Sequence, residues 1–124
     1  MTNRKERFER RRRKRFLVHN GAFVILKPSN THMGRLVDIN MYGLALEYIN
    51  VDEPVIKPVE LEIFVANNPF RMNLSCETIY DLTIYESPLS SWNKKRCGVE
   101  FGELTPDQTS QLKYFMEHHT TGEV

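Results

Sequence analysis

The sequence lacks several features that mark common classes of protein. Among its 124 residues there are only two cysteines and one tryptophan, and no apolar run approaches the length of a transmembrane helix. The apolar stretch 16–26 is interrupted at 19–21, so it does not resemble a secretory signal. We therefore expect a cytoplasmic protein with reduced thiols, in which Cys76 and Cys97 act as small buried hydrophobic residues.

Motifs typical of enzymes and metal sites are also missing. The sequence has no phosphate-binding glycine-rich loop, no nucleophile elbow and no zinc-protease helix. The four histidines show no metal-ligand spacing with the cysteines. Glu60 and Glu62 share one face of a predicted strand and are interpreted as a solvated face rather than an acid–base pair. We expect a protein that is not an enzyme and that holds no metal or cofactor.

Charge is distributed unevenly, although the formal total is only +1. Residues 1–15 contain nine Lys/Arg and two Glu, whereas the remainder contains eight Lys/Arg and fourteen Asp/Glu, so an arm of +7 precedes a body of −6. Such an arm either binds a polyanion or folds back on the acidic body. The planar fork of arginine fits phosphate oxygens and also the N7 and O6 acceptors of guanine.

A second motif, Asp38-Ile39-Asn40-Met41-Tyr42-Gly43, follows some two dozen residues after the arginines. Carboxylate and amide oxygens accept hydrogen bonds from the N–H groups of guanine, and a glycine lets a ligand approach the backbone closely. Together the two motifs predict a site for an anionic, guanine-containing ligand. Two simpler interpretations stay open: an Asx-type hairpin turn without a ligand, and a solvated terminal tail.

Beyond the arm, apolar residues alternate with a period of two, which is typical of strands with one buried and one solvated face. Short turns between them favour antiparallel pairing of successive strands. In the fifth strand, one apolar face is expected to run from Met72 to Ile84, long enough to bend around a barrel. The expected strands number six and lie at residues 16–26, 34–39, 44–49, 59–65, 71–84 and 96–101.

After the last strand, the sequence predicts a helix. Thr105 and Gln108 can form a capping box around a proline at the first helical position. Apolar residues then recur at helical spacing and should pack against the barrel or a partner: Leu112, Phe115 and Met116. The chain is thus expected to comprise a basic arm at 1–15, a β-barrel with a C-terminal helix at 16–117, and a frayed end at 118–124.

These motifs, in this order, resemble those of the PilZ domain, the bacterial receptor module for the second messenger cyclic di-GMP (c-di-GMP). The family has an R-x-x-x-R motif before its first strand, matched here by Arg11 to Arg15, and a D-x-S-x-x-G motif at a strand end, matched by Asp38 to Gly43. Cys97-Gly98-Val99-Glu100-Phe101 and the capped helix resemble the family's last strand and helix. The resemblance covers residues 10–116. It implies a six-stranded antiparallel barrel whose arginine segment is a flexible lid over nucleotide.

The resemblance also implies roles for the arginines. Arg11 and Arg15 would contact the phosphates and the Hoogsteen edges of guanine, with Arg12 as an auxiliary cation. Arg7 and Arg11 have the same spacing, but we prefer the pair Arg11 and Arg15 because Arg15 directly precedes the predicted strand.

The second motif has matching roles. Asp38 and Asn40 would form hydrogen bonds with a second guanine edge, and Gly43 would provide the turn and clearance. Asn40 stands where the family usually has serine. Asparagine keeps a donor and an acceptor but is longer, so a hydrogen bond at this position would have a shifted geometry.

The resemblance implies a receptor that orders its arm on c-di-GMP and signals in trans to a protein effector of motility, secretion or polysaccharide synthesis. No specific nucleic acid and no membrane span is expected, and the nucleotide stoichiometry and the choice between monomer and homodimer stay open. Two alternatives remain. One is a PilZ-like interaction module that does not bind nucleotide. The other is a general polyanion binder, for nucleic acid or an anionic membrane, with strong salt dependence.

Overall fold

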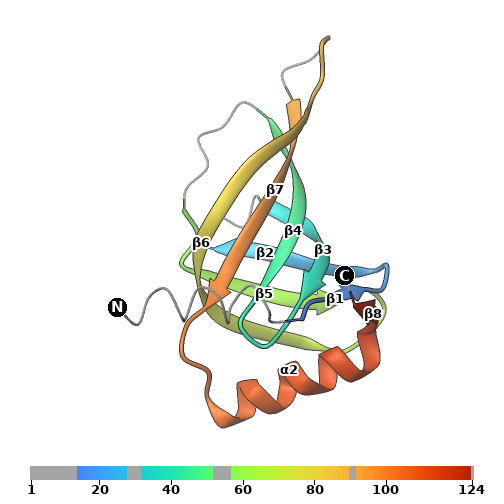
Figure 1. The fold of residues 1–124 in the computed structure, drawn as a ribbon, viewed down its shortest axis with the longest axis vertical. Helices are drawn as coiled ribbons and strands as arrows, with labels where there is room; N and C mark the ends of the chain where they lie inside the picture. The colour runs from blue at the N-terminus through green and yellow to red at the C-terminus, as the bar shows by residue number, and fades with distance from the viewer. Residues whose placement is uncertain (1–13, 28–31, 52–56, 90–91, 124) are drawn as a thin grey trace.

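The computed structural model describes residues 14–27, 32–51, 57–89 and 92–123 (Figure 1). The predicted ligand residues Arg11 and Arg12, and the alternative Arg7, lie outside this part of the chain. Its elements are β1 (Phe16–Val18), β2 (Ala22–Lys27), β3 (His32–Ile39), β4 (Gly43–Val51), β5 (Glu60–Val65), β6 (Arg71–Glu86), β7 (Trp92–Phe101), α2 (Pro106–His119) and β8 (Thr120–Glu123).

Six of these strands form a closed antiparallel barrel, and this confirms the predicted fold. The ring runs β2–β3–β4–β7–β6–β5 and returns to β2, while β1 and β8 continue the sheet beyond β3. The predicted pairing of successive strands is confirmed from β2 to β4 and from β5 to β7. The predicted pairing of β4 with β5 is wrong. Instead β4 pairs with β7, and β2 pairs with β5. These two long-range pairings close the ring.

The predicted strand at 16–26 is in fact two strands. Gly21 has a φ of 96°, a conformation that glycine adopts at little cost, and the chain turns there between β1 and β2. After the turn, β2 pairs with β5 and with the start of β3, whereas β1 pairs with the end of β3, where Leu17 is opposite Asp38. The turn therefore brings the end of the basic arm to the second motif.

The barrel interior is filled by alternate residues of the strands, as the period of two predicts. In β5, Leu61 and Ile63 are fully buried whereas Glu60 is exposed. From α2, which lies across one end of the barrel (Figure 1), Leu112 and Phe115 are buried in the same core. Burial of such side chains contributes about 1.5 to 3 kcal/mol each. The apolar stripe of the helix therefore faces the barrel, as expected.

Both ends of α2 are well defined. The predicted capping box is present, because the N–H of Gln108 donates to Thr105 Oγ1 at 3.1 Å and the N–H of Thr105 donates to Gln108 Oε1 at 3.0 Å. The expectation of a frayed end at 118–124 is wrong: the helix continues to His119, and β8 pairs with β1. Backbone pairing with β1 and an ion pair of 3.2 Å between Lys14 and Glu123 hold the final strand.

The prediction of one continuous apolar face along β6 is also wrong beyond the first half of the strand. Met72 and Leu74 are buried, but Leu82 and Ile84 are 57% and 47% exposed. Shifts in the register with β7, between Thr78 and Tyr80 and again between Thr83 and Tyr85, break the alternation. In this part of the chain, β6 and β7 project past the barrel (Figure 1). The strand β7 begins at Trp92 rather than at the predicted residue 96.

Among the described residues, no helix has the length and hydropathy that crossing a membrane requires.

Candidate functional site

The site is built around Asp38, whose orientation depends on a β-bulge in β3. The register between β3 and β4 shifts between Leu36 and Asp38, so Val37 is an extra residue. Strict alternation after Leu36 would direct Asp38 into the core. Because of the bulge, Asp38 instead lies on the outer side of the barrel, opposite Ala45, while Ile39 is buried in the core.

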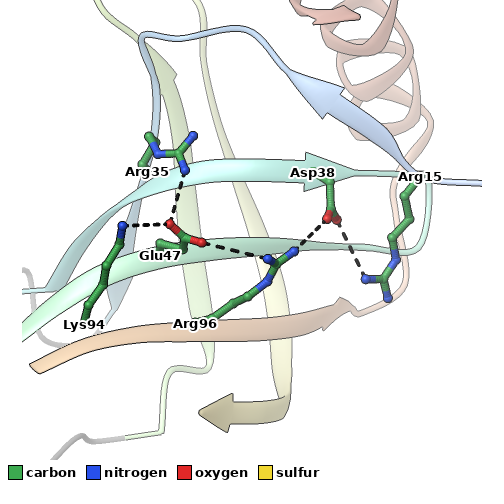
Figure 2. Close-up of polar contacts among 6 residues, drawn as sticks. All are labelled: Arg15, Arg35, Asp38, Glu47, Lys94 and Arg96. Carbon is green, nitrogen blue, oxygen red and sulfur yellow. Dashed lines mark hydrogen bonds and ion pairs between the residues drawn. The ribbon is translucent and has the colours of Figure 1, made fainter. Parts of the chain in front are cut away.

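Arginines from two distant segments meet at this carboxylate (Figure 2). Arg96 of β7 donates from Nη2 to Asp38 Oδ2 at 3.2 Å. Arg15, just before β1, places Nη1 3.8 Å from Oδ1. Asp38 is only 2% exposed, and within the described part of the chain no group donates a hydrogen bond to Oδ1. The carboxylate thus keeps an acceptor for an N–H group of a ligand.

A second carboxylate extends the arrangement along the same face. Glu47 of β4 accepts a hydrogen bond from Arg35 at 3.2 Å, and it lies 3.3 Å from Lys94 Nζ and 3.9 Å from Arg96 Nη1. We call the six residues of Figure 2 the charge cluster: Arg15, Arg35, Asp38, Glu47, Lys94 and Arg96. Four cations and two carboxylates give the charge cluster a formal charge of +2, which favours an anionic ligand.

The two carboxyl groups have pKa values shifted in opposite directions. Burial raises the pKa of Asp38 above its ordinary value, and the charges of Arg15 and Arg96 oppose this effect. Burial also acts to raise the pKa of Glu47, but hydrogen bonds and charges from Lys94 and Arg35 outweigh it and lower that pKa overall. Asp38 is therefore the less well compensated carboxylate, and an additional donor would stabilise its charged form.

Asn40 forms an Asx-type turn, as one interpretation of the sequence predicted. Its Oδ1 accepts hydrogen bonds from the N–H groups of Tyr42 at 2.8 Å and Gly43 at 3.0 Å. The amide oxygen thus organises the backbone between β3 and β4. A ligand beside this turn would meet the amide NH₂ of Asn40 as a donor.

Gly43 is required for a close approach between strands. A Cβ at this position would overlap the carbonyl oxygen of Val99 in the neighbouring β7. Its φ is not in the left-handed region. The structure therefore ties this glycine to the packing of β4 on β7.

A pocket of about 270 Å³ adjoins the charge cluster on the outer face. Arg15 belongs to both, and Asn40, Tyr42, Tyr80 and Glu100 also line the pocket. The ring of Tyr80 lies directly against Gly98, where a Cβ would overlap it. A ligand-sized pocket usually exceeds about 300 Å³, so this one suits a single planar base rather than a whole dinucleotide.

The structure therefore brings together four of the six predicted ligand residues: Arg15, Asp38, Asn40 and Gly43. Sequence reasoning did not identify Arg96, Glu47 or Tyr80 as part of the site. A signal for Arg96 exists in the alternation of β7: Cys97 and Val99 are buried on one face, so Arg96, the residue before Cys97, falls on the opposite face. No comparable signal exists for Tyr80, since its orientation depends on the bulge at Ile79.

The two cysteines lie away from this chemistry. Both are free thiols; Cys97 is buried and Cys76 is half-buried, which agrees with their interpretation as small hydrophobic residues. Burial raises the pKa of each thiol to about 11. Among the residues that the structure describes, no cluster of three metal-ligating side chains is found.

Comparisons with known proteins bear on the fold. No protein-family model and no curated protein sequence matches the chain. The PilZ domain of YcgR from Escherichia coli, solved with c-di-GMP, is similar in structure with a TM-score of 0.59 and 17% identity, over 83% of this chain and 86% of that chain. An uncharacterized Legionella protein, Lpg0364, has a TM-score of 0.52 and 18% identity, over 83% of this chain and 89% of that chain. These likenesses show that the chain has a PilZ-like fold.

Proposed function

We propose that this protein is a receptor for c-di-GMP that orders its basic arm on the nucleotide and signals to a protein effector, and that it is not an enzyme. One observation carries the proposal: Arg15 and Arg96 converge on the buried carboxylate of Asp38, beside a pocket lined by Asn40 and Tyr80. The fold that this chain shares with a PilZ domain solved with c-di-GMP supports it.

The charges of the site match those of the ligand. The surplus of two positive charges in the charge cluster equals the charge of two phosphodiester groups. A guanidinium has five N–H donors, so Arg15 and Arg96 can each contact a phosphate or a guanine N7 and O6 while facing Asp38. The oxygen Asp38 Oδ1 would accept from a guanine N–H. The predicted arm residues Arg11 and Arg12 would add further cationic contacts.

The pocket supplies the apolar part of recognition. A guanine would pack on Tyr80, where stacking on an aromatic ring contributes about 1 to 3 kcal/mol per base. The amide NH₂ of Asn40 would donate to the ligand at the edge of the pocket. Contacts with a base distinguish this site from a general polyanion site, in which phosphate contacts alone would determine affinity.

Calorimetry with c-di-GMP tests the proposal. Arg15→Ala and Arg96→Ala should each weaken binding by about 1.5 to 3 kcal/mol, or about 10- to 150-fold in Kd, because each removes a charge-assisted contact. The matched control is Arg71→Ala, since Arg71 is also an exposed, ion-paired arginine but pairs with Glu62 in β5. If both test variants bound as tightly as the parent, the assigned site would be wrong.

Competitors separate the proposal from its alternatives. GTP and duplex DNA should fail to displace c-di-GMP, and raising the salt concentration should weaken binding only modestly. Displacement by DNA together with a steep salt dependence would indicate a general polyanion binder. Absence of binding heat at high protein concentration would instead favour an interaction module that does not bind nucleotide.

A further inference from the structure

The short strand β1 lies between the candidate site and the final strand of the fold. It has only three residues and pairs with β3 along one edge and with β8 along the other. On the β3 side, Leu17 is opposite Asp38, and Arg15 directly precedes the strand. On the β8 side, Phe16 is opposite Glu123. β1 therefore connects the charge cluster to β8.

β8 has no apolar core of its own. Its sequence, Thr120–Glu123, contains only threonine, glycine and glutamate, and three of the four residues are exposed. Within the part of the chain that the structure describes, β8 pairs only with β1, so its second edge is open. Glycine and glutamate are depleted in strands, so the sequence itself gives β8 little stability. The order of β8 therefore depends on β1 and on contacts at the two ends of β8.

Both ends of β8 are attached to the segment around β1. At one end, the N–H of His19 donates to the carbonyl oxygen of His119, the last residue of α2, at 2.8 Å. At the other end, Lys14 Nζ lies 3.2 Å from Glu123 Oε1. Lys14 and Arg15 are neighbours in sequence, so one short stretch of backbone sends one side chain to β8 and the next to the charge cluster. The last residues of the basic arm therefore contact β8 and the candidate site at the same time.

The junction between α2 and β8 is packed against the core. The ring centroid of His119 lies 5.2 Å from that of Phe115, which is fully buried. Thr120 Oγ1 donates to the carbonyl oxygen of Met116 in the last turns of α2. Detachment of β8 would leave these contacts in place, because none of them involves residues 121–123. β8 is therefore a small unit that can pair with β1 or open locally without unfolding of the barrel.

We propose that β8 is a latch on the last residues of the basic arm, and that its pairing with β1 is coupled to nucleotide binding. With β8 paired, β1 has a neighbour on each edge and Glu123 holds Lys14, which restricts the positions that Arg15 reaches. A ligand that binds an already ordered Arg15 loses less conformational entropy and binds more tightly. By linkage, the bound ligand favours the paired form of β8 by the same factor. This coupling rests on the proposed nucleotide function, whereas the latch itself does not.

The charge of Glu123 distinguishes the latch from a long-range electrostatic effect. An acidic residue near a cationic site disfavours an anionic ligand through its field, so a cation in place of Glu123 should strengthen binding if the field alone mattered. In the latch, Glu123 instead promotes binding, because it holds Lys14 and keeps β8 paired. The two effects have opposite signs. The direction of the change in affinity therefore separates them.

Amide hydrogen exchange measured by NMR without nucleotide tests the latch. In a variant that stops after His119, the amides of residues 16–18 should exchange about tenfold faster than in the parent, because β1 loses the hydrogen bonds of one edge. Circular dichroism checks that this variant keeps the barrel. Glu123→Lys, in the full-length chain, should accelerate the same amides to a smaller extent. Glu117→Lys, on the exposed side of α2, makes the same change in net charge and should exchange like the parent. Unchanged exchange of residues 16–18 in both the shortened variant and Glu123→Lys would overturn the latch.

Exchange and calorimetry with c-di-GMP then test the coupling. Saturating nucleotide should slow exchange of the amides of residues 121–123 in the parent at least about fivefold, and loss of β8 should weaken binding by a similar factor. Glu123→Lys should also weaken binding, whereas Glu117→Lys should bind at least as tightly as the parent. Two results would refute the coupling: binding by the parent that leaves exchange of residues 121–123 unchanged, or tighter binding by Glu123→Lys. Absence of any binding by the parent would count against the proposed function, while the latch would be decided by exchange without nucleotide.

Discussion

Replacing Arg96 with methionine should destabilise the protein in a strongly pH-dependent manner. Arg96→Met keeps most of the side-chain length but removes the donor 3.2 Å from Asp38 Oδ2. Asp38 is 2% exposed, so its charge cannot be rehydrated without local rearrangement. Loss of a charged hydrogen-bond partner from a buried group costs about 1 to 3 kcal/mol. Arg96 itself is 34% exposed, and solvent screening reduces the expected cost to about 1 to 2 kcal/mol at pH 7.

The sign of the pH dependence follows from the shifted pKa of Asp38. Burial raises this pKa above its ordinary value of 3.8, and Arg96 is one of the charges that oppose the rise. In Arg96→Met the pKa should rise further, so the folded state binds the proton of Asp38 more tightly than the unfolded state does. Stability is then lost as the pH increases from about 3.8 through the folded pKa. The cost of Arg96→Met should be small at pH 3.5 to 4 and full at pH 7.

Urea unfolding followed by circular dichroism, at several pH values, measures this difference. Adding Asp38→Asn to Arg96→Met should recover at least about 1 kcal/mol of the loss at pH 7, because no buried charge remains. Arg71→Met is the matched control: Arg71 is exposed and forms a 3.0 Å ion pair with Glu62, so its loss should cost less than about 0.5 kcal/mol. A cost for Arg96→Met that is below this value, or that does not change with pH, would refute the reasoning.

Three further predictions concern packing, backbone and thiols. Gly98→Ala should cost about 1 to 3 kcal/mol in urea unfolding because the added methyl group overlaps the Tyr80 ring; equal stability would show that the ring does not lie there. Gly21→Ala should cost about 1 kcal/mol or more, since Gly21 has a φ of 96°, whereas Gly122→Ala, with open space around it, should be nearly neutral; equal costs would contradict this. Because burial raises the pKa of Cys97 to about 11, iodoacetamide at pH 8 should modify it at least about tenfold more slowly in the folded than in the urea-unfolded chain, and equal rates would contradict its burial.

The parts of the fold that could be predicted from the sequence are those set by local patterns. Alternation in β5 and the capping box of Thr105 and Gln108 each depend on a few neighbouring residues, and both are present. The pairing of β4 with β7 joins Gly43 to Glu100, which are distant in sequence. No local pattern specifies such a pairing, because it depends on how all six strands close into the barrel. The same holds for β8, whose polar sequence does not predict a strand and which is ordered by pairing with β1.

At the candidate site, the period-two pattern of the sequence does not predict which side chains lie on the outer face. The motif residues Asp38 and Arg15 could be chosen from the sequence because charge and spacing are visible there. Their meeting with Arg96 could not, because it requires a bulge at Val37 that turns Asp38 out of the core. A bulge adds one residue to a strand and reverses the facing of every residue after it, so a period-two pattern applied across it assigns the wrong face.

Bulges in two strands therefore shape the site that we propose to be functional. In β3, the bulge at Val37 presents on the outer face a carboxylate that two arginines compensate, and in β6 the bulge at Ile79 presents Tyr80 on that same face. Each bulge interrupts the ladder and places on the outer face a side chain that strict alternation would place in the core. A fold selected for stability alone gains little from two such interruptions beside one pocket. Deleting Val37 lets Leu36 and Asp38 pair as neighbours with Leu46 and Ala45, so Asp38 should stay on the outer face and c-di-GMP binding should persist in a folded deletion variant. Loss of binding in that variant would show that the local distortion of the bulge, and not only the facing of Asp38, is required.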